Sequence, residues 1–346
     1  MEERPEQRYH RPVLLEQTIE ALDIRPDGVY LDGTAGGGGH SFAIASRLTT
    51  GRLIALDRDP DAVKEAGQRL QGLPAVVVQA NFTQMAQVLE SLGVDGVDGV
   101  LLDIGVSSHQ LDEAGRGFSY HMEAPLDMRM SQSGVTAADL VNSLTDKELA
   151  DILFRYGEEK YAWPIAREIL RRRAAAPIVT TTELADIVRE AVPAAYRRDG
   201  HPARKTFQAL RIAVNGELDC LSAAMDTAFD CLRENGRLAI ITFHSLEDRM
   251  VKQRFNDWRR GCVCPPDFPV CVCGKKPRGR TVVDGRRRRS WCSKSRRRRR
   301  RTSWRTTPAA GAPGCAACAS CTTDMAKAKD NDAVGTGAGL PAAGKE

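Results

Sequence analysis

One short stretch, VYLDGTAGGGGHSFAIASRL at residues 29–48, places an acid, four consecutive glycines and a histidine between an apolar run and a helix-like segment. Glycine lets the backbone approach a ligand closely and adopt positive φ. A glycine-rich turn between a strand and a helix also presents free N–H groups at the helix N-terminus. Such turns bind the pyrophosphate of dinucleotides, and a similar turn binds the methionine end of S-adenosylmethionine (SAM). A flexible surface turn is the third interpretation, so the glycines need support from the rest of the chain.

Acidic and aromatic residues also stand where the next apolar runs end. Asp57 ends the run RLIALD, Phe82 follows AVVVQ, and Asp103 ends VDGVLLD. Continuous apolar runs that alternate with helices predict a parallel sheet covered on both faces. Ligands of such sheets bind beyond the carboxyl ends of the strands, so we expect the glycines and these three residues around one crevice. The predicted strands lie within residues 28–35, 52–59, 75–82, 97–108 and 236–249.

The charges around the glycines favour SAM over a dinucleotide. A carboxylate at Asp57 can accept hydrogen bonds from both hydroxyls of an adenosine ribose, and it would repel a 2′-phosphate. Asp32, directly before the glycines, suits a cationic ligand end, and SAM carries an ammonium and a sulfonium. Two carboxylates beside a pyrophosphate would repel it. A nicotinamide-linked oxidoreductase stays as an alternative, which binding of NADH without binding of SAM would favour.

The interval between the fourth and fifth predicted strands is long enough to hold a second domain. From Asp103 to Arg237 it spans 134 residues, although a crossover connection is usually much shorter. Most of the interval has apolar residues at helical spacing, and TTTELADIVREAV opens with a threonine cap and an early glutamate. We therefore predict an α/β fold of Rossmann-like type with a helical domain inserted between strands 4 and 5. The predicted boundaries are residues 1–106 and 212–280 for the α/β domain, 107–211 for the helical domain and 281–346 for a basic tail.

Charge is distributed unevenly along the chain. Residues 275–346 hold 19 Lys and Arg against 5 Asp and Glu, so this tail carries +14 and the remainder −9, for a total of +5. Overall charge therefore says little about nucleic-acid binding. Clustered cations in the helical domain suit phosphate contacts, although a solvated helix face is the commoner explanation of such clusters. The candidates for RNA contact are Arg171, Arg172, Arg173, Arg204 and Lys205.

The sequence favours a reducing compartment. The N-terminus MEERPEQRYHRP lacks an apolar segment of signal-peptide type, and no apolar run reaches membrane-spanning length. We expect a cytoplasmic protein without a membrane partner, in which the ten cysteines are free thiols; a homodimer is left open.

Four of the cysteines, Cys262, Cys264, Cys271 and Cys273, form the pattern C-x-C-x₆-C-x-C. Four thiolates could bind zinc, but C-x₂-C is the usual zinc spacing, so we expect reduced thiols and no metal.

Several longer motifs resemble the bacterial 16S ribosomal RNA (cytosine N4)-methyltransferase family. The matching stretches lie in family order over about residues 10–274: HRPVLLEQTIEAL, LDGTAGGGGHS, ALDRDP, DGVLLDIGVSSHQLDEAGRGFSY, PLDMRM, YGEEKYA, HPARKTFQALRIAVNGEL and ITFHSLEDR. The resemblance implies a class I SAM-methyltransferase fold with SAM as methyl donor. It also implies a cytidine in the decoding centre of 16S rRNA as substrate, and hence the small ribosomal subunit as partner. The SAM contacts that it implies are Gly38, Gly39, His40, Asp57, Phe82, Asp103 and Gln110.

The implied reaction does not require a covalent bond between the protein and its substrate. The exocyclic amine of cytosine is a poor nucleophile because its lone pair is delocalised into the ring, and its attack on a methyl group needs no covalent enzyme intermediate. Catalysis would come mostly from holding the amine in line with the sulfonium methyl. A group that accepts the amine N–H bonds would stabilise positive charge developing on nitrogen. Asp103 is our candidate for this positioning role; Ser107 and Ser108 are either target contacts or turn residues, and no general base is assigned.

The resemblance is expected to end near Arg280. Members of the family finish with an Asn-Pro-Arg segment and a Ser-x-x-Leu-Arg strand, whereas this chain reads GRRRRSWCSKSRRRRRRTSW. Six adjacent arginines cannot line a sheet interior, and Pro308 and Pro313 would remove ladder donors. We predict that residues 281–346 are disordered and leave a sheet edge unpaired. A basic RNA-binding arm or a shifted reading frame would explain them, and the second keeps open an alternative function: an rRNA-binding ribosome-assembly factor with impaired catalysis.

Overall fold

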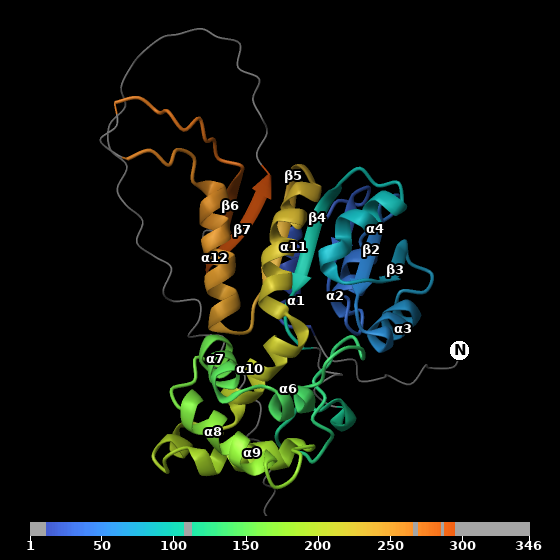
Figure 1. Ribbon diagram of the computed structural model, residues 1–346. Coiled ribbons are helices and arrows are strands. Elements are labelled where there is room, and N and C mark those ends of the chain that lie inside the picture. The colour runs from blue at the N-terminus through green and yellow to red at the C-terminus, as the bar shows by residue number, and fades with distance from the viewer. Residues whose placement is uncertain (1–11, 107–112, 266–268, 285–286, 295–346) are drawn as a thin grey trace, which may run out of the picture. The chain divides into compact units, whose positions relative to one another are not determined.

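A sheet of seven strands organises the α/β domain within the part of the chain that the structure describes (Figure 1). The computed structural model describes residues 12–106, 113–265, 269–284 and 287–294. The strand order is β3-β2-β1-β4-β5-β7-β6, and the pairs from β3 to β5 are parallel. The chain order reverses between β1 and β4, and ligands bind at such a switch point. The strands are β1 (Val29–Asp32), β2 (Arg52–Asp57), β3 (Ala75–Gln79), β4 (Val97–Asp103), β5 (Leu232–Ile241), β6 (Gly279–Asp284) and β7 (Arg287–Lys294).

Alternating side chains of the central strands feed two separate hydrophobic cores. In β2, Ile54 and Leu56 belong to one core, whereas Leu53 and Ala55 belong to the other. Side chains of a strand point alternately to opposite faces, so a continuous apolar run is the pattern that a sheet covered on both faces requires. The first core is closed by α4 (Met85–Ser91), α11 (Glu217–Cys231) and α12 (Ser245–Arg259). The second is closed by α1 (Leu15–Leu22), α2 (Gly39–Ala45) and α3 (Pro60–Arg69).

A helical domain with its own core lies between β4 and α11 in the sequence. Its buried side chains extend from Phe118 to Leu210. Threonine caps begin several of its helices. The Thr145 hydroxyl accepts from the Glu148 N–H, and the Glu148 carboxylate accepts from the Thr145 N–H. Such a capping box satisfies donors that the first turn leaves unpaired. The helices are α6 (Ala137–Ser143), α7 (Asp146–Gly157), α8 (Ala162–Arg173), α9 (Thr181–Ala191) and α10 (Arg204–Asn215), with short 3₁₀ turns at Ala114–Arg116 and Tyr196–Asp199.

These findings confirm the predicted fold class. The sheet is parallel through β5, and the helical domain is inserted between strands 4 and 5 as expected. The helix predicted from the threonine-capped stretch at 180–192 corresponds to α9. Among the described helices, none is both long enough and apolar enough to cross a membrane.

The C-terminal segment differs from the prediction. Instead of an unpaired edge after β5, β7 pairs antiparallel with it, with Leu238 opposite Cys292 and Arg237 opposite Ser293. The prediction of disorder from residue 281 onward is therefore wrong for the strands β6 and β7. Ladder hydrogen bonds are made by the backbone, which an arginine supplies as well as a valine. The arginines at 296–301 and the prolines, on which the prediction depended, lie outside the described residues. By its contacts the chain divides into residues 1–282 with 290–296, and a smaller unit of residues 283–289 with 297–346.

The pairing of β7 predicts a stability difference between two truncated chains. A chain that ends at Asp284 lacks β7, the antiparallel partner of β5, and should unfold at lower denaturant concentration than a chain that ends at Lys294. The loss should be at least about 1 kcal/mol, the net contribution of one hydrogen bond. The comparison is made by urea unfolding followed by circular dichroism, with the full chain as the control. Equal midpoints for the two truncated chains would contradict the pairing.

Candidate cofactor and active site

The glycine turn between β1 and α2 has a backbone conformation that favours glycine at two positions. Gly36 and Gly38 adopt φ of 51° and 74°, in the left-handed region that disfavours residues with a Cβ. Gly38 is the N-cap of α2, and a Cβ there would also lie 3.2 Å from the Cα of Ala66. The turn therefore lets the chain reverse from strand to helix within a few residues while α3 lies directly beside it.

Asp32 holds this turn together from inside. Its carboxylate is fully buried; one oxygen accepts from the Thr34 N–H at 3.1 Å and the other from the Ser41 hydroxyl at 2.7 Å. Burial raises the pKa of Asp32 above its ordinary value. Because both oxygens already bind the turn, the structure gives Asp32 the role of fixing the first turn of α2 to the end of β1. These two hydrogen bonds explain the burial of Asp32 without the contact to a cationic ligand that the sequence predicted.

Asp57 lies at the carboxyl end of β2 and contacts the same turn. Its Oδ2 accepts from the Gly36 N–H at 2.8 Å, and its Oδ1 accepts from the Asp59 N–H at 2.9 Å. Burial raises the pKa of Asp57, which the two backbone donors oppose. Each carboxylate oxygen has a second lone pair, so Asp57 can still accept further hydrogen bonds, including those of two neighbouring hydroxyls.

His40 and Asp103 form a pair across the crevice. The Nδ1 of His40, in α2, lies 3.4 Å from the Oδ2 of Asp103, at the end of β4. Burial alone would lower the pKa of His40, but the hydrogen bond and negative charge of Asp103 outweigh it, so the pKa is raised. The Asp103 N–H donates to the Thr34 hydroxyl at 2.6 Å, which ties β4 to the glycine turn. Within the described residues, the Nε2 of His40 and the Oδ1 of Asp103 are buried without a hydrogen-bond partner.

Phe82 follows β3 and approaches the turn from the other side. It opens a 3₁₀ turn (Phe82–Gln84) capped by Asn81, whose side chain accepts from the Thr83 N–H at 2.9 Å. A Cβ added to Gly33 would lie 3.0 Å from the Cβ of Phe82 and 2.6 Å from a Leu102 methyl group. The structure thus brings Gly38, His40, Asp57, Phe82 and Asp103 to one edge of the sheet. Gly39 begins α2 beside them, whereas Gln110, Ser107 and Ser108 lie outside the described residues.

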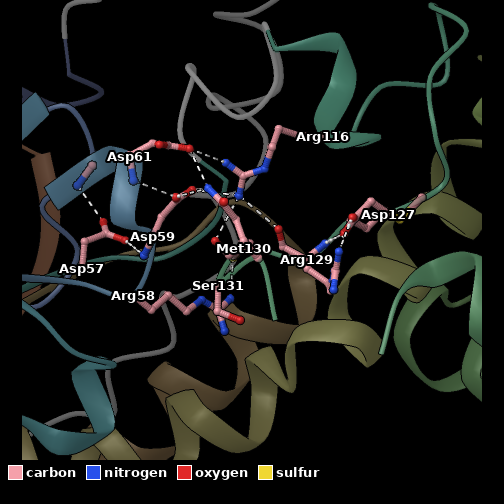
Figure 2. Close-up of polar contacts among 12 residues, drawn as sticks. Asp57, Arg58, Asp59, Asp61, Arg116, Asp127, Arg129, Met130 and Ser131 are labelled. Carbon is pink, nitrogen blue, oxygen red and sulfur yellow. Dashed lines mark hydrogen bonds and ion pairs between the residues drawn. The ribbon is translucent and has the colours of Figure 1, made fainter. Parts of the chain in front are cut away.

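A polar network joins this edge to the loop that enters the helical domain (Figure 2). Asp59 is the N-cap of α3 and is almost fully buried. Its carboxylate pairs with the Arg116 guanidinium at 2.9 Å, and Arg116 also donates to the backbone carbonyls of Arg129 and Met130 at 3.1 and 3.0 Å. Because Arg116 is only 11% exposed, this pair is shielded from solvent and fixes the PLDMRM segment beside β2.

Asn215, at the end of α10, holds the same segment from the opposite side. Its side-chain oxygen accepts from the Met130 N–H at 2.9 Å, and its amide nitrogen donates to the Met128 carbonyl at 2.8 Å. Arg58, which directly follows Asp57, donates to the Asn215 carbonyl at 3.1 Å, and burial lowers the pKa of Arg58. The carboxyl edge of the sheet and the helical domain are therefore connected by buried hydrogen bonds as well as by chain connectivity.

Buried charges also gather where β5 leads into α12. His244 caps α12, and its Nε2 lies 3.1 Å from Glu247 Oε1. Burial would raise the pKa of Glu247, but His244 and the Phe243 N–H reverse this, and the pKa is lowered. Glu217 lies close enough to form a three-ligand metal cluster with these two residues. Arg211 already donates to both oxygens of Glu217 at 2.9 Å, so a guanidinium provides the positive charge there.

Four of the five cations predicted to contact RNA already have partners on the protein. Arg171 and Arg172 pair with Glu168, and Arg172 also pairs with Glu190. Arg173 donates to the Val141 carbonyl at 2.7 Å. At the start of α10, Lys205 donates to the Glu158 carbonyl at 3.1 Å, and Arg204 follows the N-cap. None of these residues touches the cofactor edge through a described hydrogen bond or ion pair.

Sequence reasoning missed the buried residues that join the two domains: Arg58, Asp59, Arg116 and Asn215. A signal was present, because ALDRDP and PLDMRM are both unusual charged motifs for segments next to apolar runs. Their pairing could not be inferred, since Arg116 and Asp59 are separated by 57 positions. His244 and Glu247 were within a recognised motif, but no role was assigned to them.

The buried pair predicts a large difference between two arginine substitutions. Arg116→Met removes the cationic partner of the nearly buried Asp59 carboxylate, and breaking such an ion pair costs about 3–5 kcal/mol. Arg171→Met removes a pair on a side chain that is 67% exposed, and such pairs contribute about 0–1 kcal/mol. Urea unfolding of both variants and the wild type measures the free energies. Equal losses for the two variants would show that the Arg116 pair is not shielded from solvent.

Known proteins with this sequence pattern are named as methyltransferases. The family model described as the MraW methylase family matches residues 7–302. Ribosomal RNA small subunit methyltransferase H of Heliobacterium modesticaldum is 55% identical over 281 residues, covering 80% of this chain and 90% of the relative. The protein of the same name from Symbiobacterium thermophilum is 54% identical over 280 residues, covering 80% and 88%. The one from Brevibacillus brevis is 50% identical over 273 residues, covering 78% and 87%.

The match also revises where the resemblance ends. The family model extends to residue 302, so the expected end near Arg280 is wrong and both β6 and β7 fall inside the matched region. The identities confirm the predicted family and a methyltransferase over a nicotinamide-linked oxidoreductase. The chain belongs to the MraW methylase family.

Proposed function

We propose that this chain transfers a methyl group from SAM to the exocyclic N4 amine of a cytidine in the decoding centre of 16S rRNA. The observation that carries the proposal is the arrangement of Asp57, Phe82 and the His40–Asp103 pair around the glycine turn, in a chain of this methylase family. A protein acting on ribosomal RNA would work in the cytoplasm, with the small ribosomal subunit as its partner.

The residues at the sheet edge suit SAM chemically. Asp103 Oδ1 is a buried acceptor and lacks a described hydrogen-bond partner; a buried acceptor in that state is costly unless a ligand pairs with it. An ammonium group would satisfy it, and hydroxyls of a ribose would satisfy the free lone pairs of Asp57. We assign Gly38, Gly39 and His40 to the amino-acid end, Phe82 to the adenine, and Gln110 to the remaining contacts that the family resemblance implies. When bound, SAM supplies a methyl group on a positively charged sulfur.

The transfer itself is a direct displacement. The lone pair of the cytosine N4 forms the new C–N bond while the C–S bond breaks and its electron pair stays on sulfur; the amine then loses one proton to solvent. The protein contributes by aligning the two reactants. We assign Asp103 to this alignment as well, because a carboxylate that accepts an amine N–H stabilises the positive charge developing on nitrogen. His40 keeps that carboxylate in place through its 3.4 Å contact.

We expect Asp57→Ala to weaken SAM binding by about 1–3 kcal/mol, because ribose hydroxyls would lose their acceptor. Titration calorimetry with SAM alone measures this dissociation constant. Asp27→Ala is the matched control, since Asp27 is exposed and precedes the opposite, amino end of β1. A melting curve checks that the turn survives the loss of the Gly36 and Asp59 contacts. An unchanged dissociation constant in a folded Asp57→Ala protein would remove Asp57 from the ribose role.

We also propose that the helical domain contacts RNA through Arg171, Arg172, Arg173, Arg204 and Lys205. Arg171 is largely exposed in spite of its pairing with Glu168, and an arginine in a surface pair can exchange a carboxylate for a phosphate. Lys205 and Arg204 stand in the first turn of α10, where the helix dipole disfavours cations. A role outside the helix would explain their presence there.

Charge reversal tests the RNA proposal. Replacing Arg171, Arg172 and Arg173 by Glu, or Arg204 and Lys205 by Glu, should weaken binding to 16S rRNA and leave SAM affinity unchanged. Each lost phosphate contact should also lower the salt slope of RNA binding by about 1. Arg47→Glu is the control, because Arg47 is an exposed arginine of the α/β domain. Unaltered RNA affinity and salt slope in folded variants would refute the assignment.

The alternative of an assembly factor without catalysis has lost the observation that favoured it. That alternative depended on an unpaired sheet edge after β5, and β7 pairs with this strand. The deciding assay uses labelled SAM and small-subunit particles from a strain that lacks the modification. Label appearing on the N4 amine of a decoding-centre cytidine supports methyl transfer, whereas particle binding without label would favour the assembly factor.

A further inference from the structure

The loop between α12 and β6 spans residues 260–278, and its described residues, 260–265 and 269–278, form no hydrophobic core of their own. Its described part contains no helix or strand, and its three valines, Val263, Val270 and Val272, are 54%, 69% and 72% exposed. Loops of this length without secondary structure are uncommon in compact domains. The base of the loop is fixed, because the Arg278 N–H donates to the Trp258 carbonyl at 2.9 Å. Burial of these three valines does not order the described part of the loop above its base.

Four cysteine sulfurs nevertheless meet in this loop. Cys262, Cys264, Cys271 and Cys273 are free thiols whose Sγ atoms all lie within 4.8 Å of one another. The Sγ of Cys273 lies 3.6 Å from that of Cys271 and 3.7 Å from that of Cys262. A Zn–S bond of about 2.3 Å sets the sulfur–sulfur edge of a regular tetrahedron at roughly 3.8 Å. The two distances are those of ligands around one tetrahedral ion.

Backbone amides point at two of these sulfurs. The Val263 N–H donates to the Sγ of Cys273 at 3.4 Å, and the Cys264 N–H donates to the Sγ of Cys262 at 3.3 Å. Hydrogen bonds to metal-bound groups orient them and stabilise their negative charge. The first of these bonds also crosses between the two C-V-C arms of the loop, so that all four sulfurs face one point. Lys275 and Lys276 follow Cys273 after a single glycine and supply positive charge next to a tetrathiolate site.

We propose that Cys262, Cys264, Cys271 and Cys273 bind one zinc ion, which holds the loop together. This revises the expectation of metal-free thiols, which relied on the spacing C-x-C alone. Four sulfur ligands in a tetrahedron select zinc among the common divalent ions. A site with four protein ligands leaves no open position for catalysis, so the ion is structural. The metal replaces the core that the loop lacks, as it does in other small segments that fold around an ion.

The metal content of the full chain tests the proposal directly. The protein is purified without chelators, and zinc is measured by elemental mass spectrometry and by native mass spectrometry. We expect one zinc per chain. The variants Cys262→Ser and Cys271→Ser should each lose the zinc. Removing a metal ligand should lower zinc affinity by more than the ~10–100-fold that loss of an outer-shell partner costs. Cys220→Ser and Cys231→Ser are matched controls, since these thiols lie in and at the end of α11, and they should keep the zinc.

A second set of measurements separates this site from other causes of zinc binding. Replacing Cys315, Cys318 and Cys321 by Ser should leave the zinc content unchanged; a loss of zinc in that variant alone would overturn the assignment. Cobalt substituted for zinc should give the charge-transfer and visible bands of tetrahedral cobalt thiolate in the wild type and not in Cys271→Ser. Wild-type protein that is folded and reduced yet holds no stoichiometric zinc, or that holds iron in its place, would refute the proposal.

Discussion

The turn from β1 into α2 depends on one buried carboxylate, and the rest of the site depends on that turn. Asp32 binds the Thr34 N–H and the Ser41 hydroxyl inside the protein, where an unpaired carboxylate would be costly. With the turn fixed, Thr34 receives the Asp103 N–H and Gly36 donates to Asp57. Three parallel strands are thereby joined at their carboxyl ends by hydrogen bonds that pass through a glycine-rich segment without bulky side chains.

The same edge also positions the helical domain. Asp57 is followed by Arg58 and Asp59, and these two side chains reach Asn215 and Arg116 rather than solvent. The carboxyl edge of the sheet and the helical domain are thus connected by a few buried polar contacts within a single stretch of β2–α3. A methyltransferase that must align an amine with a methyl group needs this kind of rigidity, because small misplacements of the reactants cost large factors in rate.

The features that sequence-based reasoning did not reveal share a physical origin. Disorder after residue 281 was inferred from arginine-rich composition, but strand pairing of β7 with β5 is made by backbone groups that composition does not report. The arginines of α8 were identified by their clustering in the sequence, which does not report that Glu168 and Glu190 pair with two of them. The cysteine spacing was judged against the common C-x₂-C pattern, whereas the loop brings the four sulfurs together through its own reversal.

The sequence by itself determined the parallel sheet, the inserted helical domain and the residues at the strand ends, because apolar periodicity and glycine turns are local properties and the family motifs are long. It named Asp57, Phe82 and Asp103 as neighbours, since the ends of parallel strands must meet. Only the tertiary structure decided that Asp32 fixes the turn, that Arg116 pairs with Asp59 and that four cysteines converge. These contacts join residues that are far apart in the sequence. Which residues meet depends on how the helices and loops are oriented, and no local sequence pattern encodes that orientation.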